Sequence, residues 1–461
     1  MDESARLLTE IETYCRRRGI AESTFGRQAV NDGKLVGRLR RGGNVTTRTL
    51  ARVRRFLAAA APAGPAESPS PPAAAKVRPP APAGADDKRA GAFRFYDNRQ
   101  KYLLFINTCS EKRVVAERVG LELARVSPRP PGLFAFDAGM GDGTVLVRVM
   151  RHMHRRFPTT PFQIVTKEIS LEDVRLSLKK MSDRFFEHPA MVLVITNLYY
   201  TEAPWLAPRS LAAAASLNWQ EVPLSGSTTH EFDEQIADLG PLLDHGWQVR
   251  ASEKTGNPLY VRPSVLVLYR EDHRLLLDSL IPRPGQVAGR YDLVIASQPY
   301  RARMPLGFKV EKVLAPLARA LGPGGRLIGI HSHGRDPGLE IVQRMWPDEN
   351  PFTTSRHDLL AELKSALGRA GRELNFNAYS DTRSIFRYDM HTLPSEVGDS
   401  IGTSTLFAAW NAAIYVGQIE DRRLDEVITS RDYLDATAAV LQKHGGLWFN
   451  DESYVVSRKR A

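Results

Sequence analysis

The stretch LFAFDAGMGDGTVL (133–146) constrains the fold of this chain more than any other part of the sequence. Its apolar first residues predict a strand that ends near Asp137, and a helical pattern, TVLVRVMRHMHRRF, begins at residue 144. Between them stand Gly139, Gly141 and Gly143, at alternate positions. Because glycine costs backbone entropy and packs nothing, this spacing indicates a turn that something approaches closely. A strand, a glycine turn and a helix are typical of a parallel α/β sheet with a ligand at its carboxyl edge.

The same rhythm continues along the chain. Strands are predicted at 133–139, 162–170, 191–200, 291–300 and 326–332, with amphipathic helices between them. The segments 372–380 and 404–419 contain the last sheet candidates. About 90 residues separate the third and fourth strands, which is far longer than an ordinary connection. Residues 201–289 are therefore expected to form an inserted subdomain that serves as a lid or substrate platform.

The N-terminal part differs in composition from the rest. Residues 61–91 are almost all Ala, Pro and Gly and predict an extended tether. The 60 residues before it read as four short helices and hold 13 Lys and Arg against six Asp and Glu. Of the net charge of +11, these 60 residues therefore carry +7 and the rest of the chain carries +4. A basic surplus in one small module suggests an acidic partner.

Composition also excludes several classes of protein. No run approaches 18 apolar residues, so a membrane span is not expected, and the first residues lack a signal-peptide pattern. The two cysteines, Cys15 and Cys109, supply neither a disulfide framework nor a zinc set. We therefore expect a cytoplasmic protein.

The N-terminal segment 16–57 is similar to the helix-turn-helix module of phage-repressor-like regulators. In that family the third helix enters the major groove of DNA. The resemblance implies nucleic-acid contacts from Lys34, Arg38, Arg40 and Arg41. A helical module that docks a protein is the competing interpretation.

The glycine turn itself carries a second resemblance. No G-K-[ST] follows it, which disfavours a P-loop, and an acid precedes the first glycine, unlike a dinucleotide-binding turn. D-x-G-x-G-x-G resembles the first motif of class I S-adenosylmethionine-dependent methyltransferases, and VLAPLARALGPGGRLIGI (313–330) resembles the helix, turn and fifth strand of that family. The cofactor-binding residues implied are Asp137, Gly139, Gly141, Gly143, Glu168 at the end of the second strand, and Asn197 as an adenine contact.

These observations predict the fold and the domains. The fold class is α/β, with a Rossmann-like seven-stranded methyltransferase sheet that carries an inserted subdomain, plus a small all-α N-terminal domain. The domains are a helix-turn-helix-like domain at 1–60, a linker at 61–91 and a methyltransferase domain at 92–461.

The fourth predicted strand leads into Ser297-Gln298-Pro299-Tyr300. This tetrapeptide resembles the signature of methyltransferases that act on amino nitrogens, whose substrate is a planar and weakly nucleophilic amine. The resemblance implies that Ser297 and the Gln298 carbonyl accept the two N–H bonds while Tyr300 stacks on the substrate. Catalysis would then come from orientation, with little acid–base work.

Other residues leave alternatives open. His331 and His333 fit a general base, half a metal site or a pair that lines a pocket, and the last is favoured, so no metal is expected. Tyr96, Arg99, Lys101 and Tyr102 either line the mouth of the site or pack a helix on the sheet.

The sequence thus predicts a methyltransferase that uses S-adenosylmethionine and acts on an amino nitrogen, with nucleic acid as the first expected substrate. A small-molecule or peptide methyltransferase, with the insertion as its lid, is the first alternative. A DNA-binding regulator that senses the cofactor is the second. Whether the chain forms a homodimer is left open.

Overall fold

The computed structural model describes residues 3–18, 21–30, 32, 34–40, 49, 53–54, 56–57, 99–251, 258–392, 396–398, 401–429 and 431–460. The chain divides into two compact units, 1–87 and 88–461. The predicted linker 61–91 lies outside the described residues, as does most of the fourth predicted helix of the N-terminal part. Within the described parts, no helix combines the length and apolarity needed to cross a membrane.

The first unit contains three described helices, α1 (Glu3–Arg18), α2 (Glu22–Val30) and α3 (Leu35–Arg40). Their apolar residues form one small core, in which Leu7, Ile11, Phe25 and Leu35 are almost fully buried. Tyr14 and Phe25 meet edge to face in this core, with ring centroids 5.4 Å apart. Apolar residues at helical spacing give each helix an apolar face, and these faces pack together into one core.

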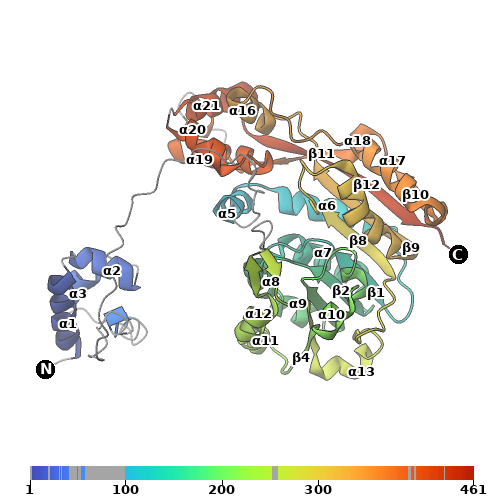
Figure 1. Ribbon diagram of the computed structural model, residues 1–461, viewed down its shortest axis with the longest axis horizontal. Helices are drawn as coiled ribbons and strands as arrows, with labels where there is room; N and C mark the ends of the chain where they lie inside the picture. Colours follow the sequence, from blue (N-terminus) through green and yellow to red (C-terminus); the bar gives the residue numbers. More distant parts are fainter. Residues whose placement is uncertain are drawn as a thin grey trace, which may run out of the picture. The chain divides into compact units, whose positions relative to one another are not determined.

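The second unit is built on one large sheet (Figure 1). Its strand order is β10-β12-β9-β8-β1-β2-β3-β7-β4, and β11 also pairs with β12. The strands are β1 (Leu133–Asp137), β2 (Phe162–Lys167), β3 (Met191–Thr196), β4 (Asn218–Leu224), β7 (Ser264–Arg270), β8 (Tyr291–Ser297), β9 (Leu321–Ser332), β10 (Leu374–Asn377), β11 (Ile385–Asp389) and β12 (Trp448–Arg458), with β5 (Val249–Ala251) and β6 (Pro258–Tyr260) in a separate hairpin.

Helices join and cover these strands. They are α5 (Arg99–Thr108), α6 (Glu111–Leu123), α7 (Thr144–Arg156), α8 (Leu171–Leu178), α9 (Ser182–Glu187), α10 (Leu211–Ala215), α11 (Thr229–Ala237), α12 (Gly240–Gly246), α13 (Arg274–Leu277), α14 (Leu306–Phe308), α15 (Ala315–Arg319), α16 (Pro337–Met345), α17 (Arg356–Leu367), α18 (Asp381–Ser384), α19 (Thr403–Val416), α20 (Asp421–Ile428) and α21 (Asp432–His444). One π turn, Lys309–Leu314, joins α14 to α15.

The seven strands from β10 to β3 confirm the predicted α/β sheet. β1, β2, β3, β8 and β9 are mutually parallel, whereas β12 runs antiparallel to both β9 and β10. Every residue of β2 and β3 is buried, because helices cover both faces of a parallel sheet. Helices α6 and α7 pack on one face, and α15 and α17 pack on the other.

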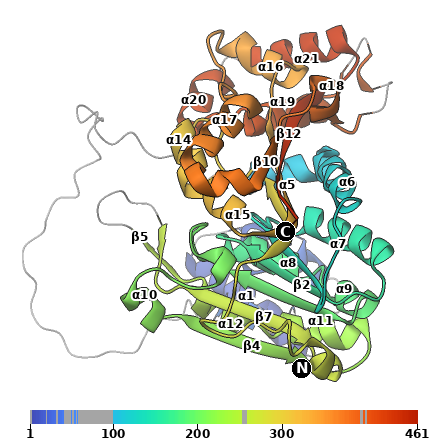
Figure 2. The ribbon, with the colours of Figure 1, turned by 90° about the vertical axis from the view of Figure 1, so that its right-hand side faces the viewer.

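The predicted insertion extends this sheet beyond β3. Its strand β7 pairs antiparallel with β3, and β4 pairs with β7 at the border of the sheet (Figure 2). All seven residues of β7 are buried. The insertion thus contributes two strands to the main sheet as well as the β5–β6 hairpin.

The prediction of a last strand within 404–419 is wrong, because this segment forms the helix α19. Alanine favours a helix, and Ala409, Trp410, Ala412 and Ala413 are buried at helical spacing. The strands β11 and β12 close the sheet instead. Figure 1 shows α16 and α19–α21 gathered near β11 and β12, where Phe449 joins their shared core.

A buried ion pair ties β12 to α17. Arg356 Nη1 lies 2.8 Å from Glu452 Oε2, and the two side chains are 3% and 2% exposed. The Arg356 backbone N–H also donates to Glu452 Oε1 at 2.8 Å, and its Nε donates to the carbonyl of Ala378 at 2.7 Å. Removing one partner of such a pair leaves a buried charge without compensation.

We predict that Arg356→Met lowers the free energy of unfolding by about 3 kcal/mol or more, the usual cost of breaking a buried pair. The control is Arg344→Met, which breaks the more exposed pair with Glu340 and should cost less than about 1 kcal/mol. Urea unfolding followed by circular dichroism measures both. Equal losses in the two variants would contradict this account of the pair.

Candidate functional site

The glycine turn lies at the carboxyl end of β1, between Asp137 and the first residue of α7. Gly141 and Gly143 have φ of +54° and +79°, a region that favours glycine. A Cβ at Gly143 would also lie 2.8 Å from Ser177 Oγ, and one at Gly141 would lie 3.0 Å from the Tyr102 hydroxyl. The fold itself therefore requires glycine at both positions.

Gly139 is different, because the described fold gives no reason for it. Its φ lies outside the left-handed region, and no atom lies within 4 Å of the place that a Cβ would take. The residue is exposed. The absence of a side chain leaves open space over the turn, which is room for a ligand.

Asp137, the last residue of β1, is buried. Its Oδ1 accepts a hydrogen bond from the Gly139 backbone N–H at 3.2 Å. Burial raises the pKa of Asp137 to about 6, although the Gly139 N–H and Lys112 lower it in part. The acid at the head of the motif thus holds the turn, and it is ionised at neutral pH at a cost to the fold.

Glu168 follows β2 directly and reaches the same turn. Its Oε2 accepts from the Gly141 N–H at 2.7 Å, and its Oε1 accepts from the N–H groups of Ile169 and Ser170 at 2.7 and 2.8 Å. Burial raises the pKa of Glu168, against the opposing effects of these N–H groups and Lys167. Asp137, the three glycines and Glu168 therefore come together at the carboxyl ends of β1 and β2.

The side chain of Asn197 has another use. Its Nδ2 donates to the carbonyls of Gly246 and Arg262 at 3.1 and 3.3 Å, and its Oδ1 accepts from the Ser264 N–H at 2.8 Å. It is buried. The structure uses this amide to join β3 to the insertion, which leaves the predicted adenine contact without support from the side chain.

The segment Ser297–Tyr300 leaves the sheet at the end of β8. Gln298 has φ of +48°, a conformation that costs a side-chain-bearing residue about 1 kcal/mol. Its N–H donates to the Ile330 carbonyl at 2.8 Å, and its Nε2 donates to Ser332 Oγ at 3.1 Å. The Pro299 carbonyl accepts from the Tyr200 hydroxyl at 2.9 Å. The sheet holds this strained turn firmly in place.

Tyr300 is turned toward the neighbouring strands. Its hydroxyl lies 3.2 Å from the Tyr454 hydroxyl and 3.4 Å from His331 Nδ1. Burial is the main cause that raises the pKa of Tyr300 above its ordinary value. The ring is partly enclosed by Lys309, whose Nζ lies 5.4 Å from the ring centroid. Tyr300 is thus part of a polar cluster, and its role as a substrate platform stays a prediction.

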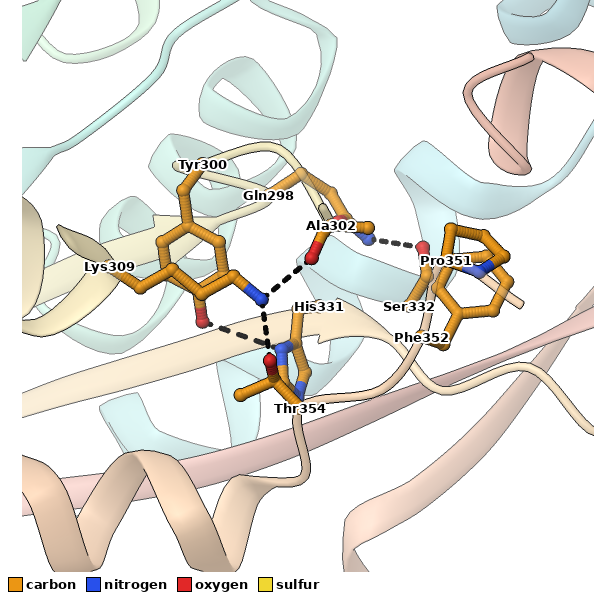
Figure 3. Close-up of a pocket in the computed structure, with 9 residues that line it drawn as sticks. All are labelled: Gln298, Tyr300, Ala302, Lys309, His331, Ser332, Pro351, Phe352 and Thr354. Atoms are coloured by element: carbon orange, nitrogen blue, oxygen red, sulfur yellow. Dashed lines mark hydrogen bonds between the residues drawn. The ribbon is translucent and has the colours of Figure 1, made fainter. Parts of the chain in front are cut away.

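A small cavity opens among these groups (Figure 3). Its volume is about 10 Å³, room for one group the size of a water molecule. Its lining residues are Gln298, Tyr300, Ala302, Lys309, His331, Ser332, Pro351, Phe352 and Thr354.

Two residues of this cluster escaped the sequence analysis. Lys309 lies in the π turn, where its Nζ donates to the Ala302 carbonyl at 2.7 Å and to Thr354 Oγ1 at 2.8 Å, and burial lowers its pKa to about 8. Glu452 lies in β12 and accepts from His331 Nε2 at 2.8 Å. The hydrogen-bond partners of Lys309 and Glu452 lie far away in the sequence or on another element. No local sequence pattern could therefore identify these two residues.

The helix α5 lies against the glycine turn. The Tyr102 hydroxyl is 3.1 Å from Asp142 Oδ1, and Lys101 pairs with Asp421. Tyr96 and the side chain of Arg99 lie outside the described residues. Tyr102 therefore contacts the glycine turn, and the choice between lining the mouth of the site and packing a helix on the sheet stays open.

The predicted nucleic-acid contacts stay predictions. In the first unit Arg40 pairs with Glu12 at 2.6 Å and also with Glu22, and Arg38 pairs with Asp32 at 2.7 Å. Lys34 is exposed, and Arg41 lies outside the described residues. Two of the four cations therefore already have carboxylate partners within their own unit.

We predict that Asp137→Asn stabilises the ligand-free protein above pH 6. The folded pKa of Asp137, about 6, is raised from 3.8, so stability is greatest below the lower value and is lost as the pH rises through the higher one. At ~1.4 kcal/mol per pKa unit, the variant should gain about 3 kcal/mol at pH 8 and less than about 1 kcal/mol at pH 4. Urea unfolding at both pH values measures this, with exposed Asp278→Asn as the control. A gain that does not depend on pH would contradict the burial of a charged Asp137.

Comparison with known proteins gives distant structural likeness alone. No protein family model and no curated protein matches the sequence. The [4+2]-cyclase SpnF aligns at 13% identity with a TM-score of 0.30, over 80% of this chain and 88% of that chain. A geranyl diphosphate methyltransferase in complex with GPP and sinefungin aligns at 11% identity and a TM-score of 0.27, over 74% and 78%. PKMT2 from Rickettsia typhi, in complex with AdoHcy, aligns at 10% identity with a TM-score of 0.25, over 80% of this chain and 55% of that chain. The fold assignment rests on the strand order of this sheet.

Proposed function

We propose that the second unit is a methyltransferase that uses S-adenosylmethionine. The observation that carries the proposal is Gly139, an exposed glycine whose missing side chain serves nothing in the described fold. It stands in a D-x-G-x-G-x-G turn, at the carboxyl end of β1, and the acid at the end of β2 reaches the same turn. This edge of a parallel sheet is where such folds bind their ligands.

The residues around the turn fit this cofactor chemically. S-adenosylmethionine carries a sulfonium and an α-amino group, both cationic, and the site offers the buried carboxylates of Asp137 and Glu168. Glu168 would accept the ribose hydroxyls, and the open space over Gly139 would receive the amino-acid end. When bound, the cofactor supplies an electrophilic methyl group. The task of the chain is to hold it in a dry site and to orient the acceptor.

The acceptor would lie at Ser297–Tyr300, and the sequence pattern there favours an amino nitrogen. Nucleic acid is the acceptor suggested by the basic N-terminal unit. The site itself favours a small molecule or peptide, because Asp137 and Glu168 are buried at this edge and would repel phosphates. The insertion after β3 would then help to enclose the acceptor.

We predict that Gly139→Leu weakens cofactor binding without unfolding the chain. The open space over Gly139 accepts the new side chain, but the ligand then loses its place, so the affinity for S-adenosylmethionine should fall at least tenfold, which is about 1.4 kcal/mol. Gly240→Leu is the matched control, because no atom lies within 4 Å of its Cβ position either. Calorimetry measures affinity and thermal melting measures stability. Unchanged affinity in Gly139→Leu would refute the proposed cofactor site.

We further predict that the acceptor is a small molecule or peptide. The full chain is incubated with methyl-labelled S-adenosylmethionine and with separate extracts of nucleic acid, peptides and small molecules. Label in the peptide or small-molecule fraction is the expected result, and label in nucleic acid would show that the N-terminal unit, rather than the acidic site, decides the substrate. Binding of the cofactor with no label anywhere would favour a DNA-binding regulator that senses it.

A further inference from the structure

Three side chains from three different strand ends form a chain of hydrogen bonds that ends at the cavity. Tyr300 follows β8, His331 lies in β9 and Glu452 lies in β12. The Tyr300 hydroxyl is 3.4 Å from His331 Nδ1, and His331 Nε2 is 2.8 Å from Glu452 Oε1. Figure 3 shows Tyr300 and His331 together on the wall of the cavity.

The directions of these bonds follow from the charge of Glu452. Although burial alone would raise its pKa, bonds from His331 and Arg356 lower the pKa of Glu452 to about 2, so it is a carboxylate that accepts. His331 must then carry a proton on Nε2, which in the neutral ring leaves Nδ1 as an acceptor. Tyr300 donates its single O–H to Nδ1, and Tyr454 donates to the Tyr300 oxygen at 3.2 Å. One lone pair of the Tyr300 oxygen remains for a ligand.

We propose that Tyr300, His331 and Glu452 form a proton relay that takes the proton of a neutral N–H or O–H group placed in the cavity by the methyl acceptor. The acceptor donates to the Tyr300 oxygen. As the acceptor atom becomes methylated, its N–H or O–H bond breaks, the proton passes to Tyr300, and the Tyr300 proton passes to His331 Nδ1. The ring becomes an imidazolium beside Glu452, and the electron pair stays on the acceptor atom. The assignment of the acceptor as a methyl acceptor rests on the proposed function.

The charged groups around the relay favour transfer of the proton toward His331. Arg356 balances Glu452, His333 Nδ1 lies 3.6 Å from the other oxygen of that carboxylate, and Asp381 pairs with Arg356 on its outer side. Lys309 Nζ lies 5.4 Å from the centroid of the Tyr300 ring. Its charge disfavours a cationic ligand and favours loss of the proton from the acceptor. The preferred ligand is therefore neutral before the transfer.

Because Tyr300 is enclosed, it passes the proton on and does not store the charge. Because burial raises the pKa of Tyr300, a lasting tyrosinate is unfavourable, and the proton must move through the hydroxyl and rest on His331. The cavity of about 10 Å³ admits one head group the size of a water molecule, so the body of the acceptor lies outside it. Phe352 and Pro351 form the apolar part of the wall.

The relay is tested first on the full chain without cofactor, by NMR of protein labelled with ¹⁵N in its histidines. The probes are phenol for O–H and aniline for N–H, and anisole, which has neither, is the control. We expect both donors to shift the His331 Nδ1 resonance, phenol to move it toward the imidazolium value, and anisole to leave it unchanged. Tyr300→Phe should abolish the response, and His333→Gln should retain it. The proposal would be overturned if anisole shifted the His331 Nδ1 resonance or if neither phenol nor aniline shifted it. An unchanged shift in Tyr300→Phe would also overturn it.

Turnover supplies a second and separate test. With the fraction that the wild-type chain labels, His331→Gln should lower kcat by about 10²-fold or more, the usual contribution of a general base. The affinity for S-adenosylmethionine should stay unchanged, because His331 belongs to the acceptor side of the site. An unchanged kcat would overturn the relay. Failure of the wild-type chain to bind S-adenosylmethionine would instead refute the proposed function, and the NMR response would still decide the relay.

Discussion

The antiparallel pairing of β12 with β9 is the constraint on which the site depends. Its register sets Glu452 opposite His331 and Asp451 opposite Ser332. Because side chains alternate between the two faces of a strand, a slip of one residue would send the Glu452 carboxylate to the other face and break its bonds to His331 and Arg356. The same strand closes the sheet against β10 and β11. One pairing therefore completes the core and aligns the polar cluster.

Several features of the site destabilise the folded state, and they lie at the carboxyl ends of the parallel strands. Asp137 and Glu168 are carboxylates in a buried environment that raises the pKa of both. Gln298 holds a backbone conformation that favours glycine. Such strain and burial persist only where the surrounding sheet overdetermines the structure, and they are common at functional sites. The apolar strands β2 and β3, buried throughout, supply that support.

Local pattern was sufficient for the first half of the sheet and failed for its last strands. The glycine turn, its flanking strand and its helix lie where the sequence predicts them, because each signal acts within a few residues. The segment 404–419 was misread because apolar residues rich in Ala, Phe and Tyr do not by themselves distinguish a buried helix from a strand. The sequence predicts an adenine contact for Asn197, whereas its amide joins β3 to the insertion through residues 49 to 67 positions away.

The sequence by itself determined the order of the five parallel strands, the place of the insertion and the acid-led glycine turn, since these depend on spacing along the chain. The tertiary structure decided which glycine is free of any packing role, because only neighbours from α5 and α8 distinguish Gly141 and Gly143 from Gly139. It also decided that Tyr300, His331 and Lys309 line one cavity, and that Glu452 bonds His331 from outside it. Those residues span more than 150 positions, and only strand pairing brings them within hydrogen-bonding distance.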